Sequence, residues 1–182
     1  MSITDQTSPG NTPQLQFRSF QDLMRRRIRD VLLISSPYDS FIFEEGGALH
    51  ELIHDEYSDL SLTHSPEFTR VSTGEEALAL LAGERAIDLV ITTPHIEDLH
   101  PLQLVKKARE GGRDVPIVLL AFDNRELADL LAHPLASLFS GIFVWQGDFR
   151  LIIAIIKQLE DRMNVGRDTG AGGVQSIILI ED

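Results

Sequence analysis

Two pairs of histidines are spaced so that each pair could share a ligand. His50 and His54 lie four residues apart in an amphipathic stretch, which would place both imidazoles on one face of a helix. His95 and His100 lie five residues apart in a stretch typical of a loop, with no third ligand in view. We favour a helix surface for the first pair and a surface loop for the second, and we predict neither a metal site nor a cofactor.

Adjacent carboxylates offer a second kind of chemistry, because Mg²⁺ prefers oxygen ligands. The sequence VQSIILIED, residues 174–182, contains one strand's length of apolar residues and stops at the pair Glu181 and Asp182. A chain end is usually polar and untethered, so this pattern predicts the opening strand of a further domain. The alternative is that the strand joins the edge of the preceding sheet and that its two acids have no chemical role.

Composition limits the classes of function that fit the chain. Of its 182 residues, 43% are hydrophobic, which is enough apolar material for one core. The lack of cysteine excludes disulfides and cysteine-bound zinc, and it fits a reducing cytoplasm. No apolar run approaches the ~20 residues that a membrane span needs. Because a net charge of −12 repels nucleic acid and anionic membranes, we predict a cytoplasmic protein that binds neither.

Five apolar runs alternate with helical patterns along the chain. The runs lie in DVLLIS, FTRVS, DLVITT, VPIVLLAF and GIFVWQG, and charges or turn formers bound each one. Near-continuous apolar strands separated by helices are typical of a parallel sheet covered on both faces. The predicted fold is therefore α/β, with a doubly wound, five-stranded, flavodoxin-like sheet. In such sheets, ligands bind at the carboxyl ends of the strands.

The middle of the chain resembles a known signalling module. GEEALALL, DLVITT and VPIVLLA have the order and spacing of the second helix, third strand and fourth strand of a response-regulator receiver domain, the CheY-like module of two-component signalling. The resemblance covers about residues 30–163 and implies a role in bacterial phosphorelay signal transduction. It also implies a phosphorylation site with an acidic pair after the first strand and an aspartate ending the third. A hydroxyl residue ending the fourth strand and a lysine ending the fifth complete that site.

The sequence departs from the family pattern at every one of these positions. The acidic pair falls on Ser35 and Ser36, the phosphoacceptor on Thr93, the hydroxyl residue on Ala121 and the lysine on Gln146. Serine hydroxyls lack the charge with which carboxylates hold Mg²⁺, and threonine is a weak nucleophile without an adjacent base. We therefore predict a degenerate pseudo-receiver that is not an enzyme and is not phosphorylated at the usual site.

Other acids lie close to this site in the sequence and could replace the missing pair. They are Asp39, Glu44, Glu45, Glu97 and Asp98. Because strand-end geometry admits only particular positions to such a site, we favour solvated helix starts for these acids.

Without phosphoryl chemistry, the resemblance leaves protein–protein interaction as the expected function. The last helical pattern, DFRLIIAIIKQLEDRMN, has a broader apolar stripe than one docking face requires. The predicted interaction face comprises Trp145, Leu151, Ile152, Ile155, Ile156 and Leu159. Expected partners are a neighbouring receiver or other domains of the parent protein, a sensor kinase, or a second copy of the chain.

Further segments flank the receiver-like residues 30–163. Polar residues 1–16 predict disorder, and residues 17–29 predict a leading helix with four arginines, Arg25, Arg26, Arg27 and Arg29. We favour a solvated helix face for these arginines over an anion or partner contact. Gly-rich residues 164–173 predict a linker, and residues 174–182 the first strand of a truncated second receiver. FQDLM, PYDSF and VWQGD also resemble large bacterial proteins in which receiver-like modules precede a phosphoenolpyruvate-synthase-type region.

The main alternative is a flavodoxin-like domain that binds the phosphate of a flavin or nucleotide at the same strand ends. It would require a phosphate loop after the first strand, where SSPYDSF has hydroxyls but no glycine. A DNA-binding effector would need a helix-turn-helix pattern, and none remains once the sheet is assigned.

Overall fold

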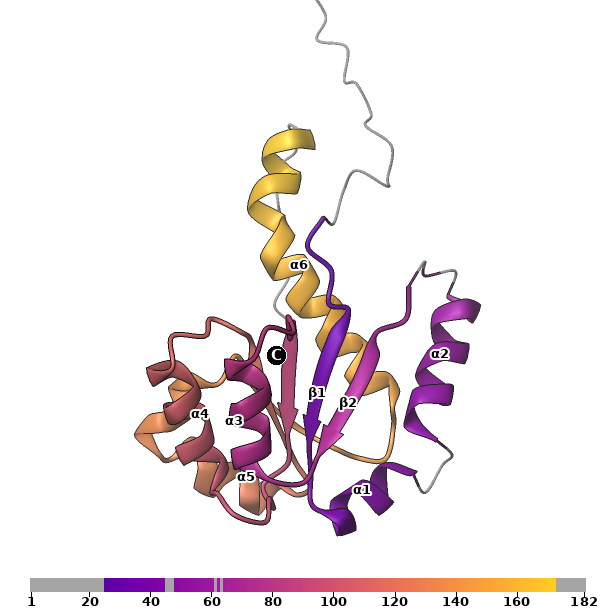
Figure 1. Ribbon diagram of the computed structural model, residues 1–182. Coiled ribbons are helices and arrows are strands. Elements are labelled where there is room, and N and C mark those ends of the chain that lie inside the picture. Colours follow the sequence, from indigo (N-terminus) through magenta and orange to yellow (C-terminus); the bar gives the residue numbers. More distant parts are fainter. Residues whose placement is uncertain (1–24, 45–47, 61, 63, 173–182) are drawn as a thin grey trace, which may run out of the picture.

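A five-stranded parallel sheet lies between two layers of helices in the computed structural model, which describes residues 25–44, 48–60, 62 and 64–172 (Figure 1). The strand order is β2-β1-β3-β4-β5 and every pairing is parallel. The strands are β1 (Asp30–Ile34), β2 (Glu67–Val71), β3 (Leu89–Thr92), β4 (Ile117–Ala121) and β5 (Gly141–Val144). The predicted doubly wound, five-stranded α/β fold is confirmed.

Helices cover both faces of the sheet because the central strands bury side chains in both directions. One layer contains α1 (Pro37–Glu44), α2 (Leu49–Asp59) and α6 (Arg150–Gly172). The other contains α3 (Gly74–Ala82), α4 (Pro101–Glu110), α5 (Asn124–Leu131) and the 3₁₀ helix η2 (Pro134–Leu138). In β1, Val31 and Leu33 pack toward the first layer, while Leu32 and Ile34 pack toward the second. None of the described helices is both long enough and apolar enough to cross a bilayer.

Asp98 fixes the loop between β3 and α4 against the start of α3. Its carboxylate accepts the backbone N–H of Gly74 at 2.6 Å and that of Glu75 at 3.0 Å. Desolvation opposes ionisation of Asp98, but backbone hydrogen bonds and the positive charge of Lys107 together hold the pKa of its carboxyl below its usual value. Gly74 is required by this close approach, since a Cβ there would lie 2.9 Å from the Cβ of Leu99.

The segment before β1 is not the helix that the sequence predicts, at least from residue 25 to residue 29. Its backbone N–H groups bond to side chains elsewhere in the fold: Arg26 donates to Asn164 Oδ1 at 3.0 Å, and Ile28 donates to Glu160 Oε1 at 2.9 Å. Because these donors have distant partners, the segment has no need of helical hydrogen bonds. Residues 17–24 of the predicted leading helix and the predicted disordered residues 1–16 lie outside the described residues.

The predicted Gly-rich linker is also wrong for residues 164–172, because α6 continues to Gly172. Asn164 is almost completely buried, and its side-chain amide donates to the carbonyls of Arg26 and Glu160 at 2.7 Å each. Further along, the Thr169 hydroxyl donates to the Val165 carbonyl at 2.6 Å. A helix nucleated by tertiary packing extends through residues of low propensity, because each added residue gains a hydrogen bond. The predicted terminal strand, with Glu181 and Asp182, lies outside the described residues.

The predicted interaction face is instead part of the core. Five of its six side chains are more than 90% buried: Trp145, Ile152, Ile155, Ile156 and Leu159. The sixth, Leu151, is partly buried and packs against the same cluster. The stripe on α6 is broad because this helix lies against several strands and buries more of its circumference than a docking helix would. The described structure therefore leaves no partner surface at these positions.

Candidate functional site

The degenerate family positions Ser35, Ser36 and Thr93 meet at the carboxyl edge of the sheet, as predicted. The Thr93 N–H donates to the Ile34 carbonyl at 3.0 Å, and the Ser36 N–H donates to the His95 carbonyl at 3.1 Å. These bonds join the end of β1 to the end of β3, because the two strands are parallel neighbours. Ser35 and Thr93 are essentially inaccessible to solvent.

Hydrogen bonds within the protein engage the hydroxyls of this edge. The Thr93 hydroxyl donates to the His95 carbonyl at 3.3 Å, and the Ser35 and Ser40 hydroxyl oxygens are 2.8 Å apart. The Ser36 hydroxyl accepts the backbone N–H of Asp39 at 3.1 Å and so caps the start of α1. Each of these serine and threonine side chains thus makes at least one hydrogen bond that completes the local structure.

The remaining two family positions supply neither a hydroxyl nor a cation. Ala121 ends β4 with a fully buried methyl group, and its carbonyl accepts the N–H of Trp145 at 2.7 Å. Gln146 is exposed at the end of β5, just before Gly147, whose φ of +86° makes the chain turn there. At position 146, to which the resemblance assigns a lysine, the side chain is therefore a neutral amide.

Asp39 is one carboxylate that the site does contain, and its position corrects the interpretation of the nearby acids as solvated. Its side chain, on α1, is only 2% exposed, and its Oδ2 atom lies 3.7 Å from Nδ1 of His95 with no hydrogen-bond partner. Glu97 and Asp98 are exposed, as predicted, whereas the side chains of Glu44 and Glu45 lie outside the described residues.

His95 connects three elements around this edge. Sequence reasoning missed this role of His95, and it also missed Glu126 as its partner. The Nε2 atom of His95 lies 3.1 Å from Oε1 of Glu126 on α5, and its Nδ1 faces Asp39. Oε2 of Glu126 also accepts the N–H of Phe122 at 3.1 Å. The 61% exposure of the His95 side chain confirms the predicted surface loop. The contact with Glu126 has no local signal in the sequence, because the two residues are 31 positions apart.

Aromatic rings fill the adjoining space. The Phe43 ring lies edge-on to Trp145, with centroids 4.9 Å apart, and 6.1 Å from the ring of Phe122. The His95 ring is parallel to that of Phe122, at a centroid distance of 6.4 Å. Nε1 of Trp145 is buried and has no partner among the described residues. This apolar surrounding favours packing at the edge and disfavours the accumulation of ionic charge.

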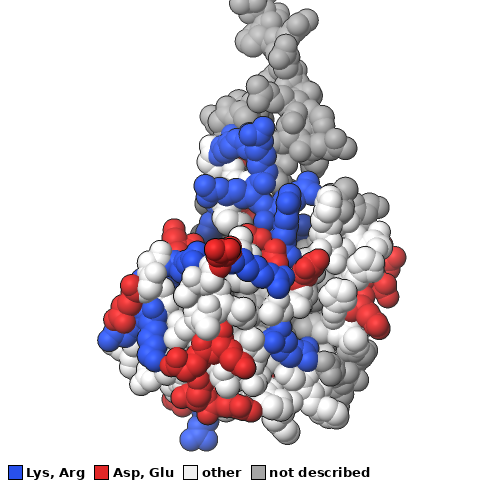
Figure 2. All heavy atoms as spheres, viewed as in Figure 1, with Lys and Arg blue, Asp and Glu red and all other residues white. Residues whose placement is uncertain are grey.

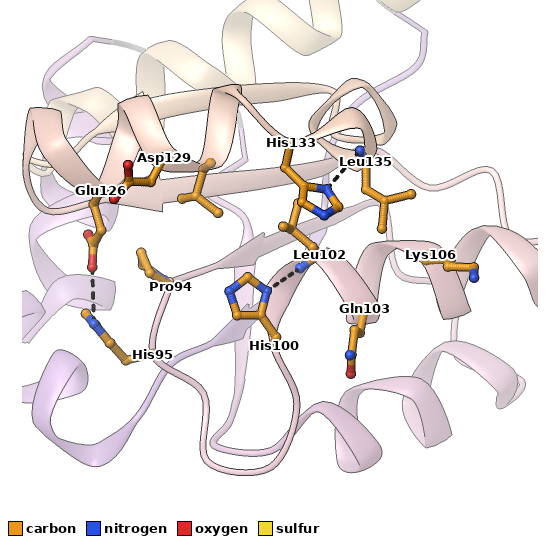
Figure 3. A pocket seen from close by; sticks show the side chains of 11 residues that line it. Pro94, His95, His100, Leu102, Gln103, Lys106, Glu126, Asp129, His133 and Leu135 are labelled. Atoms are coloured by element: carbon orange, nitrogen blue, oxygen red, sulfur yellow. Dashed lines mark hydrogen bonds and ion pairs between the residues drawn. The ribbon is translucent and has the colours of Figure 1, made fainter.

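A cavity of about 760 Å³ opens beside this edge, between α4 and α5 (Figure 3). Its side chains include His100 and His133, whose Nδ1 atoms accept the N–H groups of Leu102 and Leu135 and thereby cap α4 and η2. Figure 3 shows the acids Glu126 and Asp129 at one end and Lys106 at the other. The cavity therefore has mixed charge, and two of its imidazoles have structural roles.

The histidine pair on α2 is part of a longer motif that also includes the glutamate after the first histidine. His50–Glu51–Leu52–Ile53–His54 matches H-E-x-x-H, which binds zinc in metalloproteases when a third ligand is present. Both histidines are exposed, as predicted, and their rings stack with centroids 6.4 Å apart. Among the described residues, no three histidine or acidic side chains are arranged to hold a metal ion, so the pattern alone defines no zinc site there.

Comparison with known proteins agrees with this fold. No protein-family model matches the sequence. The rice (Oryza sativa subsp. japonica) two-component response regulator ORR5 is 31% identical over 90 residues, which cover 44% of this chain and 67% of the rice protein. The chain therefore belongs to the receiver family of two-component response regulators.

Solved structures of receivers share the fold at lower sequence identity. A CheY-like receiver domain protein from Methanospirillum hungatei superimposes with a TM-score of 0.55 at 12% identity, covering 76% of this chain and 98% of that one. The response regulator TrrA from Thermotoga maritima, solved in complex with Mg²⁺ and BeF, gives a TM-score of 0.52 at 20% identity, covering 72% and 98%. At these identities the match supports the fold alone.

Proposed function

We propose that this receiver is a non-catalytic regulatory module that contacts other signalling proteins and does not accept a phosphoryl group at the usual site. The observation that carries the proposal is the set of side chains at the carboxyl edge of the sheet. Ser35, Ser36 and Thr93 supply no carboxylate, and Gln146 supplies no cation. Phosphoryl transfer depends on electrostatic stabilisation by a metal and by cations, and neither can be assembled from these side chains.

The geometry of the site supports the same proposal. The Thr93 hydroxyl is buried and donates its proton to a carbonyl, so it lacks an adjacent base that would make it a nucleophile. Asp39 supplies a single carboxylate, whereas Mg²⁺ requires several oxygen ligands in near-octahedral geometry. The alternative of a flavin- or nucleotide-phosphate site at this edge gains no support, because Ser35, Ser36 and Thr93 use their hydroxyls internally.

We expect the chain to remain unmodified when it is incubated with acetyl phosphate and Mg²⁺. Intact-mass measurement followed by fragment mapping checks this result. A receiver that retains the acidic pair and the phosphoacceptor aspartate serves as the positive control for the reagent. A phosphoryl adduct on Thr93 or Asp39 would show that the proposal is wrong.

Two aromatic side chains on α1 form the contact surface that we propose for the partner. Tyr38 is 75% exposed and Phe41 is 70% exposed, which makes them the most exposed large hydrophobic side chains in the described part of the chain. Three residues apart, they share one face of a helix that begins beside the degenerate site. Exposed aromatic side chains at a helix surface are typical anchors of protein interfaces. The partner is another two-component protein: a neighbouring receiver of the parent chain, a sensor kinase or a second copy.

We expect a photo-crosslinking amino acid at Tyr38 to capture a receiver or a kinase in the native cells, because the partner would cover this position. Mass spectrometry of the crosslinked peptides identifies the captured protein. Leu60, 55% exposed after the end of α2, is the control position, since it is apolar and exposed but distant from the degenerate site along the chain. Equal capture from both positions, or capture only of proteins unrelated to two-component signalling, would contradict the proposed surface.

A further inference from the structure

Four arginines gather at the amino edge of the sheet, opposite the edge that contains the degenerate site. Arg25, Arg26, Arg27 and Arg29 line a cleft of about 550 Å³ together with residues of the β1 start, the segment before β3 and α6. Figure 2 shows lysine and arginine side chains, in blue, concentrated where the segment before β1 meets α6. In a chain with a net charge of −12, such a concentration of positive charge is a local exception.

The backbone of the arginine segment is held in place by side chains from distant parts of the chain. Asn164 accepts the N–H of Arg26 and donates to its carbonyl, at 3.0 and 2.7 Å. Glu160 accepts the N–H of Ile28 at 2.9 Å, and Asp88 accepts the N–H of Arg29 at 2.8 Å. Asn164 and Glu160 are each only 2% exposed. The segment is therefore fixed before any ligand arrives, which lowers the entropic cost of binding.

Three of the four arginine side chains are available to a ligand. Arg25, Arg26 and Arg29 are exposed, and within the described ranges their guanidinium groups form no ion pair. The acids in the cleft already have partners: Asp30 forms an ion pair with Arg85, and Asp88 accepts the N–H groups of Arg29 and Asp30. The cleft thus presents a surplus of positive charge to the solvent.

We propose that this cleft binds a small organic polyphosphate of the nucleoside triphosphate class. Guanidinium groups match phosphate oxygens in bidentate geometry, and several on one fixed segment suit a compact, multiply charged anion. The volume lies within the range of small-molecule sites. Ala86 and Met163 add apolar wall to the cleft, against which an organic moiety can pack. A long polyanion fits less well, because the net charge of −12 on the whole chain opposes contacts that extend far from the cleft.

Titration of the chain with ATP and with inorganic tripolyphosphate at physiological salt tests this site. We expect saturable binding by calorimetry, with amide chemical shifts that change in residues 25–30 and not at Ser35, Ser36 or Thr93. Arg26→Gln and Arg29→Gln should each weaken binding by roughly tenfold or more, because each removes a charge-assisted contact. Their urea unfolding midpoints should stay unchanged, since both side chains are exposed.

Arg125→Gln is the matched control. Arg125 is an exposed arginine on α5, and its substitution makes the same change in net charge at the opposite edge of the sheet. Stronger binding of ATP than of tripolyphosphate would show that the organic moiety contributes, and equal binding would show that the arginines recognise phosphate alone. No saturable binding of either probe, equal weakening by Arg125→Gln, or shift changes confined to the carboxyl edge would overturn the proposal. None of these outcomes bears on whether Thr93 accepts a phosphoryl group.

Discussion

Replacing Ile155 with aspartate is expected to abolish cooperative folding. Ile155 is 1% exposed and packs in the core cluster formed by α6 and one face of the sheet. Removing its apolar side chain costs about 2–5 kcal/mol, and a buried unpaired carboxylate adds several kcal/mol more. Because domains of this size are typically stable by only about 5–15 kcal/mol, little or no net stability remains. Circular dichroism during urea unfolding measures the effect.

Ala154→Asp is the control for this prediction, because it introduces the same charge at the neighbouring position of the same helix. Ala154 is exposed, so its substitution should change stability by no more than about 0.5 kcal/mol. A folded Ile155→Asp variant with a near-normal unfolding midpoint would contradict the burial of the α6 stripe. It would also reopen the interpretation of Ile155 as part of a partner surface.

Replacing Thr93 with aspartate is expected to destabilise the domain without making it a phosphoacceptor. The introduced carboxylate would be buried, would face the His95 carbonyl that now accepts the threonine hydroxyl, and would lie in an edge that already contains Asp39. An uncompensated buried charge costs roughly 3–5 kcal/mol. With serines at positions 35 and 36, the variant still lacks the acidic pair that would share a metal ion with it.

Thr93→Val provides the matched comparison, because it removes the hydroxyl and keeps the shape and neutrality of the side chain. It should cost only about 1 kcal/mol, the usual contribution of one hydrogen bond. Urea unfolding gives both free energies, and intact mass after treatment with acetyl phosphate and Mg²⁺ reports phosphorylation. Equal stability of the two variants would show that the edge tolerates a buried charge. A phosphoryl adduct on the introduced carboxylate would show that the edge can hold Mg²⁺.

The sheet and the residue types at its carboxyl edge could be predicted from the sequence. The near-continuous apolar runs at β1, β3 and β4 require strands that are buried on both faces of the sheet. Because these runs alternate with helical patterns, few folds other than a doubly wound parallel sheet fit the sequence. The parallel register then carries Ser35, Ser36 and Thr93 to one edge, because parallel strands end together. That these positions contain serine and threonine, where the resemblance implies carboxylates, is visible without coordinates.

Features that depend on partners distant in the sequence could not be predicted and became visible only in the folded chain. The arginine segment has an apolar spacing typical of a helix, but Asn164 and Glu160, 138 and 132 residues away from their partners, bond its N–H groups instead. The buried carboxylate of Asp39 lies 3.7 Å from Nδ1 of His95, a residue of the β3–α4 loop. The apolar stripe of α6 could have faced either a partner or the protein's own sheet, since periodicity indicates that a face is buried and not what covers it. Hydrophobic patterning depends on residues close together in the sequence. These contacts are long-range tertiary contacts, which only the folded structure specifies.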